Sequence, residues 1–155
     1  MKQIKNSFFF LVILALLLSA CRSGQQATGS ENEKQTASIY DCKSLILSDV
    51  PFRELKTDYF ELLTARIEED CLQVVVSYSG GCGTVDFSLY HSRQIMKSMP
   101  PQTNIFLSLN DNDPCRELVQ DTLWFDLSPF AYHAGAEGIM LRLNQYEETL
   151  LYKYP

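Results

Sequence analysis

The sequence is most informative in its middle, where apolar and polar residues alternate through Leu72-Gln73-Val74-Val75-Val76-Ser77-Tyr78. Side chains two residues apart point to the same side of an extended strand, so positions 72, 74, 76 and 78 share one face. The alternation recurs in further runs, whose apolar faces are Val85, Phe87 and Leu89; Ile105, Leu107 and Leu109; Leu123, Phe125 and Leu127; and Ile139, Leu141 and Leu143. Each run predicts a strand that is buried on one face.

Two further strands are expected, one near Leu62–Glu68 and a terminal one at Leu150–Tyr154. Glu69-Asp70 is the expected turn into the strand that begins at Cys71. About seven strands in one domain predict an all-β fold, an antiparallel β-sandwich that is immunoglobulin-like. A small β-barrel is the alternative. Short helical pieces are expected near Pro51–Phe60 and Arg93–Met99.

The N-terminus has the pattern of an export signal. Met1–Asn6 is basic, and Phe8–Leu18 is an unbroken run of 11 apolar residues, whereas a membrane-spanning helix needs about 20. The following Leu18-Ser19-Ala20-Cys21 resembles the lipobox of bacterial lipoproteins. The resemblance implies that residues 1–20 are removed and that Cys21 is lipidated on its sulfur and acylated on its new amine. An ordinary signal peptide beside a chance cysteine is the alternative.

A flexible tether is expected after the lipidated cysteine. Residues 22–38 contain no aromatic residue and no Leu, Ile, Val or Met, so they cannot bury enough apolar surface to fold. The expected organisation is therefore a signal at 1–20, an anchor and tether at 21–38, and one folded domain at 39–155. Arg22, not Asp, follows Cys21, and by resemblance to Gram-negative sorting signals this favours the outer membrane, on its periplasmic side or at the cell surface.

The charge balance excludes one large class of partners. The chain has 13 Lys and Arg against 19 Asp and Glu, and Lys2 and Lys5 leave with the signal. The mature chain then has a net charge of about −8, because 11 basic residues face 19 acidic ones. Nucleic acids and anionic lipid surfaces bind clustered Lys and Arg, so no nucleic-acid partner is expected.

Four cysteines remain besides Cys21, and in an exported protein an even number predicts disulfides. Four cysteines allow three pairings, and the strand directions choose among them. The loops that hold Cys82 and Cys115 fall at one end of the expected sandwich, whereas Cys71 begins its strand at the other end. The sequence therefore predicts Cys82–Cys115 and Cys42–Cys71.

A second resemblance rests on Tyr78-Ser79-Gly80-Gly81-Cys82, Asp86-Phe87, Asp113-Pro114-Cys115 and Phe125-Asp126-Leu127-Ser128-Pro129. These motifs resemble those of a group of small bacterial lipoproteins with no assigned function, and the resemblance covers about 80 residues. In that group a histidine often stands three residues after the first cysteine, where this chain has Val85. An acid often follows the second cysteine, where this chain has Arg116. The resemblance implies a fold and an envelope location, and it adds no activity.

The candidates for catalysis are few. Cys82 lies between glycines and could act as a nucleophile with His91 or His133 as its base, but a disulfide is the favoured interpretation. Ser79 is not in a G-x-S-x-G elbow, because Ser77 stands at the first glycine position. His91 falls on an inward phase, and His133 falls in an expected loop. We therefore expect no enzyme activity, no zinc site and no cofactor.

The run Asn110-Asp111-Asn112-Asp113 is rich in oxygen ligands. Calcium prefers six to eight oxygens, so Asp111 and Asp113 are weak candidate ligands. The run lacks the glycine and the closing glutamate of an EF-hand loop. Turns of this composition usually close a loop through local side-chain hydrogen bonds, which is the alternative.

The outward phase of the strands predicts a binding face. If Leu123 and Phe125 point inward, Trp124 and Asp126 point outward, and the same reasoning turns Phe106 and Tyr90 outward. Aromatic rings among polar neighbours can stack on sugars or anchor a protein. The alternative is that the segment before the first strand, or the loop 93–102, covers them.

Two functional hypotheses follow from these features. The first is a lipid-anchored binding or accessory module for an envelope protein complex or a glycan, which acts through Trp124, Phe106, Tyr90 and Asp126. The second is a small inhibitor of an envelope-attacking hydrolase, in which the loops around Cys82 and Cys115 enter the target's site.

Overall fold

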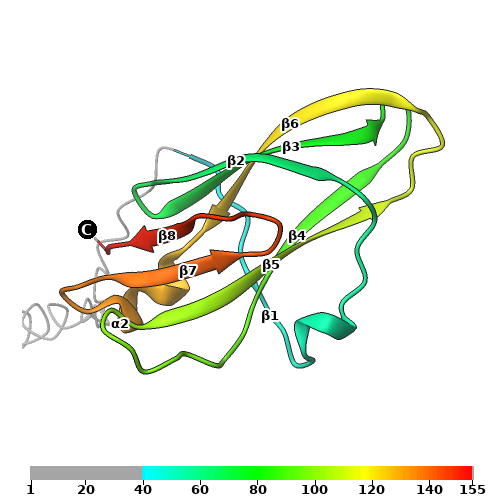
Figure 1. Cartoon of the computed structure of the whole chain (residues 1–155). Coiled ribbons are helices and arrows are strands. Elements are labelled where there is room, and N and C mark those ends of the chain that lie inside the picture. Colours follow the sequence, from blue (N-terminus) through cyan, green and yellow to red (C-terminus); the bar gives the residue numbers. More distant parts are fainter. Residues whose placement is uncertain (1–39, 155) are drawn as a thin grey trace, which may run out of the picture. The chain divides into compact units, whose positions relative to one another are not determined.

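The computed structural model describes residues 40–154 of the 155-residue chain. The predicted signal peptide, the lipidation of Cys21 and the tether lie outside the described residues. Within them the chain folds into two β-sheets with a few short helical turns (Figure 1). No helix of this part of the chain combines the length and the apolar character needed to cross a membrane.

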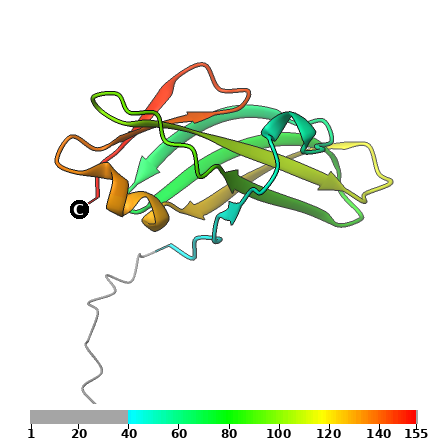
Figure 2. The ribbon, with the colours of Figure 1, turned by 90° about the horizontal axis from the view of Figure 1, so that it is seen from below.

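The smaller sheet has three antiparallel strands in the order β2-β3-β6. Their bounds are Glu61–Glu68, Cys71–Gly80 and Glu117–Asp126. The larger sheet has five strands in the order β1-β4-β5-β7-β8. Their bounds are Ile46–Leu47, Val85–His91, Gln102–Asp111, Ile139–Leu143 and Thr149–Tyr152. The two sheets lie one over the other, which Figure 2 shows from below.

The apolar faces of both sheets form one core. The alternation in β3 is confirmed, because Leu72, Val74 and Val76 are each fully buried. The rings of Tyr78 and Phe87 meet across the sheets, with centroids 5.4 Å apart. The inward residues of the other strands belong to the same cluster: Phe87, Leu89, Ile105, Leu107, Leu109, Leu123, Phe125, Ile139, Leu141 and Leu143. Burial of this apolar surface is the main force that holds the sheets together.

The fold is sandwich-like, with two open sheets, but the prediction that all strands are antiparallel is wrong. β1 pairs with β4 in parallel, and β5 pairs with β7 in parallel. The second pairing follows from the path of the chain, because β6 returns in the other sheet before β7 runs beside β5 in the same direction. An immunoglobulin-like arrangement is not confirmed.

The helical predictions are partly wrong. A 3₁₀ helix, η1, spans Phe52–Glu54 inside the expected region, but no helix forms at 93–99. There the chain turns back, and the N–H of Met96 donates to the carbonyl of Gln102 over 2.8 Å. A segment this short gains too few helical hydrogen bonds to offset the cost of nucleation. Helical turns instead follow β6, as η2 (Ser128–Phe130, with a proline in its first turn) and α2 (Ala131–Ala134).

Residues 40–54, which we call the leading segment, connect the two sheets. Lys43 joins the edge of β6, because its N–H donates to the carbonyl of Trp124 and its carbonyl accepts from the N–H of Asp126. A few residues later β1 adds to β4 in the other sheet. The disulfide Cys42–Cys71 fixes the start of this segment to the start of β3.

Candidate functional site

The loops β3–β4 and β5–β6 meet at one end of the molecule, on the right in Figure 1. The register places them there, because Gly80 pairs with Glu117 and Val85 pairs with Asp111. We call residues 81–84 and 112–116 the tip. Cys82 and Cys115 form the predicted disulfide across it, with Cα atoms 5.8 Å apart. Two disulfides in one small domain are typical of proteins that fold outside the cytoplasm.

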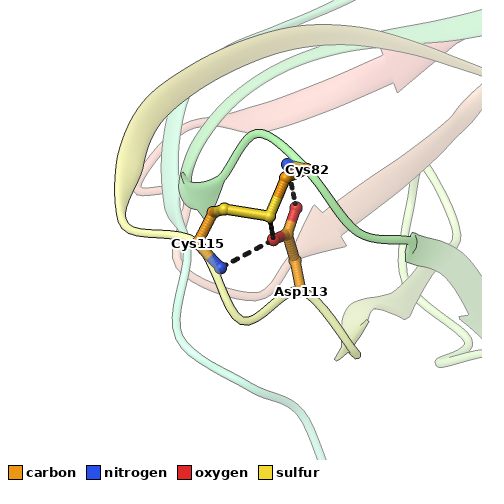
Figure 3. Close-up of side chains that lie close together, drawn as sticks. All are labelled: Cys82, Asp113 and Cys115. Atoms are coloured by element: carbon orange, nitrogen blue, oxygen red, sulfur yellow. Dashed lines mark hydrogen bonds between the residues drawn. A yellow bond between two sulfur atoms is a disulfide. The ribbon is translucent and has the colours of Figure 1, made fainter.

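The Asp113 carboxylate holds the two tip loops together. Its Oδ2 accepts the backbone N–H groups of Gly81 at 2.8 Å and Cys82 at 3.0 Å. Its Oδ1 accepts the N–H of Cys115 at 2.8 Å, as Figure 3 shows beside the disulfide. Such charge-assisted hydrogen bonds favour the ionised carboxylate. Backbone donors, with Cys115 the strongest, therefore hold the pKa of Asp113 below its usual value.

Two glycines let the loops approach this closely. A Cβ atom at Gly83 would lie 2.6 Å from the Cα of Asp113, which is closer than such atoms can come. Gly81 has a φ of +116°, a conformation that residues with a side chain rarely adopt. A disulfide, a buried carboxylate and required glycines together make the tip a preorganised surface.

Two large apolar side chains are exposed beside the tip. Leu118, the second residue of β6, is 85% exposed, and Tyr59 is 86% exposed. Tyr59 is held at this end by its neighbour, because the Asp58 N–H donates to the carbonyl of Leu109 and its Oδ2 accepts the N–H of Asp111. An exposed tyrosine on a rigid support is a typical anchor of protein interfaces, and the exposed Leu118 adds apolar surface beside the tip.

The surface around the tip is acidic. Residues 111–121 contain Asp111, Asp113, Glu117 and Asp121, and Arg116 is the only basic residue among them. The carboxylates at 121, 113 and 111 lie close enough to Tyr78 to raise its pKa, after burial as the larger cause. This end of the molecule therefore presents a negative potential, which attracts a basic partner.

The predicted calcium ligands have other partners. Oδ1 of Asp111 accepts the N–H of Asp113 at 2.8 Å, and both Asp113 oxygens accept backbone N–H groups. This is the loop-closing pattern that the sequence analysis held as the alternative. Among residues 40–154, Cys82, Asp113 and Cys115 form a cluster of possible ligands. The two sulfur atoms are bonded to each other, so neither is available as a thiolate.

The residues considered for catalysis do not assemble. Cys82 is in a disulfide, and Ser79 lies within β3. His91 ends β4, about 20 Å along the strand from the tip, and packs edge-on against Phe130. Burial lowers the pKa of His91. His133 is exposed in α2, which follows the far end of β6. Neither histidine stands where it could act on Cys82.

The predicted binding face is divided between the two sheets. Trp124 and Asp126 lie on β6 of the smaller sheet, whereas Phe106 and Tyr90 lie on β5 and β4 of the larger one. All four point outward as expected, but the outer faces of two packed sheets point away from each other. The four residues therefore come from two different sheets, and a binding face that joins them stays a prediction.

The leading segment also covers two of these rings. Tyr40 stacks on Trp124 with ring centroids 4.0 Å apart, and Phe52 packs on Phe106 at 5.6 Å. The carboxylate of Asp126 accepts hydrogen bonds from the N–H and the hydroxyl of Ser128, each at 2.8 Å. The structure thus favours the alternative in which the segment before the first strand covers the outward aromatics.

An open groove of about 630 Å³ lies beside the leading segment. It is lined by residues 48–52, 92–94, 96 and 104, so the β1–η1 connection forms one wall and the chain after β4 the other. Asp49 and Arg93 form an exposed ion pair there, 3.4 Å apart. Exposed ion pairs of this kind contribute little energy. The groove has no preorganised polar group comparable with Asp113.

Tyr59 and Leu118 were not predicted from the sequence as site residues. The outward position of Leu118 could have been predicted. It lies six residues before Trp124, an even number, so on a strand that began earlier it would point to the same side as Trp124. The position of Tyr59 could not have been predicted, since it lies outside any alternating run. Its position at the tip depends on the hydrogen bonds that Asp58 makes with β5.

No protein-family model matches the chain, and no curated protein matches it. Among solved structures, it is similar to a NigD-like immunity protein from Bacteroides caccae, with 17% identity and a TM-score of 0.48. That match covers 66% of this chain and 51% of the other. A protein of unknown function from Bacteroides vulgatus has the same identity and TM-score, with 74% and 58% covered. The chain thus spans little more than half of either protein, and the similarity is distant.

Proposed function

We propose that this protein is a non-catalytic binding protein of the bacterial envelope that recognises a partner protein through its tip. The observation that carries the proposal is the locked geometry at Asp113. One carboxylate holds three backbone N–H groups beside a disulfide, so both loops are ordered before any partner arrives. A preorganised surface loses little conformational entropy on binding, which favours affinity.

The tip is preferred over the outward aromatics for a specific reason. Trp124 and Phe106 already pack against rings of the leading segment, whereas Tyr59 and Leu118 are exposed beside the tip. A partner that used the aromatics would first have to displace Tyr40 or Phe52. A partner that used the tip would meet an apolar side chain within a negative field without any rearrangement.

In its finer form, the proposal makes the protein a small inhibitor. A narrow end with two rigid loops can enter a cleft, and its acidic charge fits a cleft lined by Lys and Arg. An envelope-attacking hydrolase is the partner that we propose. The predicted lipid on Cys21 and the tether at 22–38 would hold the inhibitor near the membrane and let its tip reach a target above the surface.

Site-specific photocrosslinking tests the proposal. A photoreactive phenylalanine analogue replaces Tyr59 in the full-length protein, in the native envelope. A matched control places it at Tyr132, which is 92% exposed in α2, beyond the opposite end of β6. We expect one partner of defined mass to be crosslinked from position 59 and not from position 132. The partner, once purified, should bind the Tyr59→Ala variant at least tenfold more weakly, and the Tyr132→Ala variant unchanged.

The competing hypothesis gives a different result in the same assay. If Trp124→Ala abolishes binding while Tyr59→Ala does not, the partner uses the outward aromatics and the tip proposal fails. Inhibition is checked separately, by adding the purified protein to the partner and measuring hydrolysis. If the partner is bound but its hydrolysis is not inhibited, this protein is a binding module and not an inhibitor.

A further inference from the structure

The first half of β6 is an open sheet edge. β6 has β3 on one side, and on the other side residues 40–154 cover only its end, through Lys43 at Trp124 and Asp126. Residues 117, 118 and 120–122 are all exposed. Open edges of this kind can pair with another chain, and natural proteins usually protect them with charges, prolines or a covering segment. β6 contains no proline, so within the described part of the chain its protection comes from its charges and from Lys43.

The bonding at Lys43 shows which backbone groups point outward. The carbonyl of Trp124 and the N–H of Asp126 face Lys43, away from β3. Outward groups recur at every second residue of an antiparallel edge, so those of Leu118, Gln120 and Thr122 face the same side. None of the backbone hydrogen bonds that residues 40–154 form outside the sheets involves Leu118 or Gln120. The Thr122 N–H donates to Asp121 Oδ1 at 2.7 Å.

We propose that this edge, residues 118–122, receives an extended basic segment of the partner as an added β-strand. The inference rests on the proposed function, because the edge begins directly after the tip. Leu118 belongs to the edge and is also one of the two exposed side chains beside the tip. An added strand gains affinity from main-chain hydrogen bonds and specificity from its alternate side chains. It would also continue the position that Lys43 already occupies on β6.

The charges along this edge favour a basic partner and disfavour a second copy of this chain. Glu117 and Asp121 flank the edge, and the nearby carboxylates of Asp111 and Asp113 have the same sign. Two copies that paired through β6 in antiparallel fashion around Gln120 would bring these acids together. Like charges opposite each other destabilise a strand pair, whereas Lys or Arg on the incoming strand would stabilise it.

An NMR titration of the mature chain, labelled with ¹⁵N, tests the inference. The probe is an acetylated and amidated octapeptide that alternates Lys and Val. One control peptide has Glu in place of Lys, and the other carries N-methyl groups on every amide, so that neither of its edges can donate an N–H to β6. We expect the amide signals of Leu118 and Gln120 to shift with the Lys-Val peptide. The N-methylated peptide should bind at least tenfold more weakly, because it cannot complete the ladder, and the Glu peptide should cause no shift.

Two variants locate the effect on this chain. Gln120→Pro removes the outward N–H at a position where an edge strand tolerates proline, and Gln120→Ala is its matched control. We expect Gln120→Pro to weaken the peptide at least tenfold relative to Gln120→Ala. If Gln120→Pro does not fold, the N-methylated peptide on the natural chain still decides the question.

Several results would overturn the inference. If the N-methylated peptide binds as tightly as the Lys-Val peptide, or if the shifts are confined to Tyr59 and the tip, the peptide is held by charge attraction and does not add a strand. If no amide signal shifts, residues 118–122 do not receive a basic strand. A concentration-dependent dimer that Gln120→Pro dissociates would make a second copy the occupant. In all three cases the crosslink from Tyr59 still reports on the proposed function separately.

Discussion

The two disulfides close loops of similar length, but one lies in exposed loops and the other reaches a buried cysteine. Cys82 and Cys115 are 33 residues apart and join exposed loops at the tip, outside the core cluster. Cys42 and Cys71 are 29 residues apart, and Cys71 is only 1% exposed. In the chain-entropy model each stabilises the fold by about 3–4 kcal/mol, because the loop lengths barely differ. The difference therefore lies in what each bond positions, a surface at one end and the leading segment at the other.

The two ends also use a carboxylate in different ways. At the far end the buried Tyr152 donates its hydroxyl to Asp70 Oδ1 at 2.8 Å, so a side chain from the last strand is tied to the β2–β3 turn. At the tip Asp113 accepts three backbone N–H groups instead. One carboxylate anchors the core, and the other shapes loops. The comparison predicts that damage at the far end lowers the stability of the whole domain, whereas damage at the tip changes the surface.

The largest effect is expected from removing the disulfides one at a time. Cys42→Ala with Cys71→Ala should lower the free energy of unfolding by about 4–5 kcal/mol, since chain entropy and the burial of Cys71 are both lost. Cys82→Ala with Cys115→Ala should cost about 3–4 kcal/mol, from chain entropy alone. Urea unfolding of the mature chain measures both. An equal loss, or a larger loss from the tip pair, would contradict the comparison of the two ends.

The second effect concerns the anchor at the far end. Tyr152→Phe should lower the free energy of unfolding by about 2 kcal/mol, because a buried hydrogen bond to a carboxylate is lost. Burial, followed by Asp70, raises the pKa of Tyr152, so the loss should not vary with pH near neutrality. Tyr154→Phe is the control, since Tyr154 is 55% exposed and should change stability by less than about 0.5 kcal/mol. A neutral Tyr152→Phe would show that the Asp70 contact does not stabilise the fold.

The smallest effect is expected at Asp113 and is local. Asp113→Asn should speed hydrogen exchange at the amides of Gly81, Cys82 and Cys115 while the core strands keep their protection. In the natural chain the folded pKa of Asp113 is lowered from 3.8. Its contribution is therefore complete above the unfolded pKa and is lost as the pH falls through the lower folded value.

Hydrogen exchange between pH 5 and pH 2 measures this dependence. Glu137→Gln, at an exposed site near α2, is the control and should leave the tip amides unchanged. If the tip amides lose protection well above pH 4 in the natural chain, the carboxylate does not hold the loops as the hydrogen bonds indicate.

Much of the fold was predictable because strand alternation is a local property. The inward set in β3 and the tip disulfide both followed from the period of two and from the strand directions. The start of β6 at Glu117 was missed, because Val119 is the one residue of 117–122 that packs against the core, and a single inward residue shows no alternation. The helical turn at 131–134 was missed for a related reason, since four residues show no helical period.

The candidate site was predictable only in part. Cys82, Cys115 and Asp113 were visible as a cysteine pair and an aspartate-rich loop. That Asp113 also holds the N–H groups of Gly81 and Cys82 could not be predicted, because these two residues lie 32 and 31 residues away along the chain. The division of the outward aromatics between two sheets could not be predicted, because alternation determines whether a residue points inward or outward, but not which sheet its strand joins.

Four features follow from the order and composition of the residues alone: the alternation of apolar and polar residues, the predicted cysteine pairing, the acidic charge and the lack of a recognisable catalytic motif. These are properties of neighbouring residues and of composition. The tertiary structure decided that β1 and β7 pair in parallel, that Tyr40 and Phe52 cover Trp124 and Phe106, and that Tyr59 and Leu118 stand exposed beside the tip. Those outcomes depend on contacts between distant segments, whose free energies are set by the packing of the whole domain.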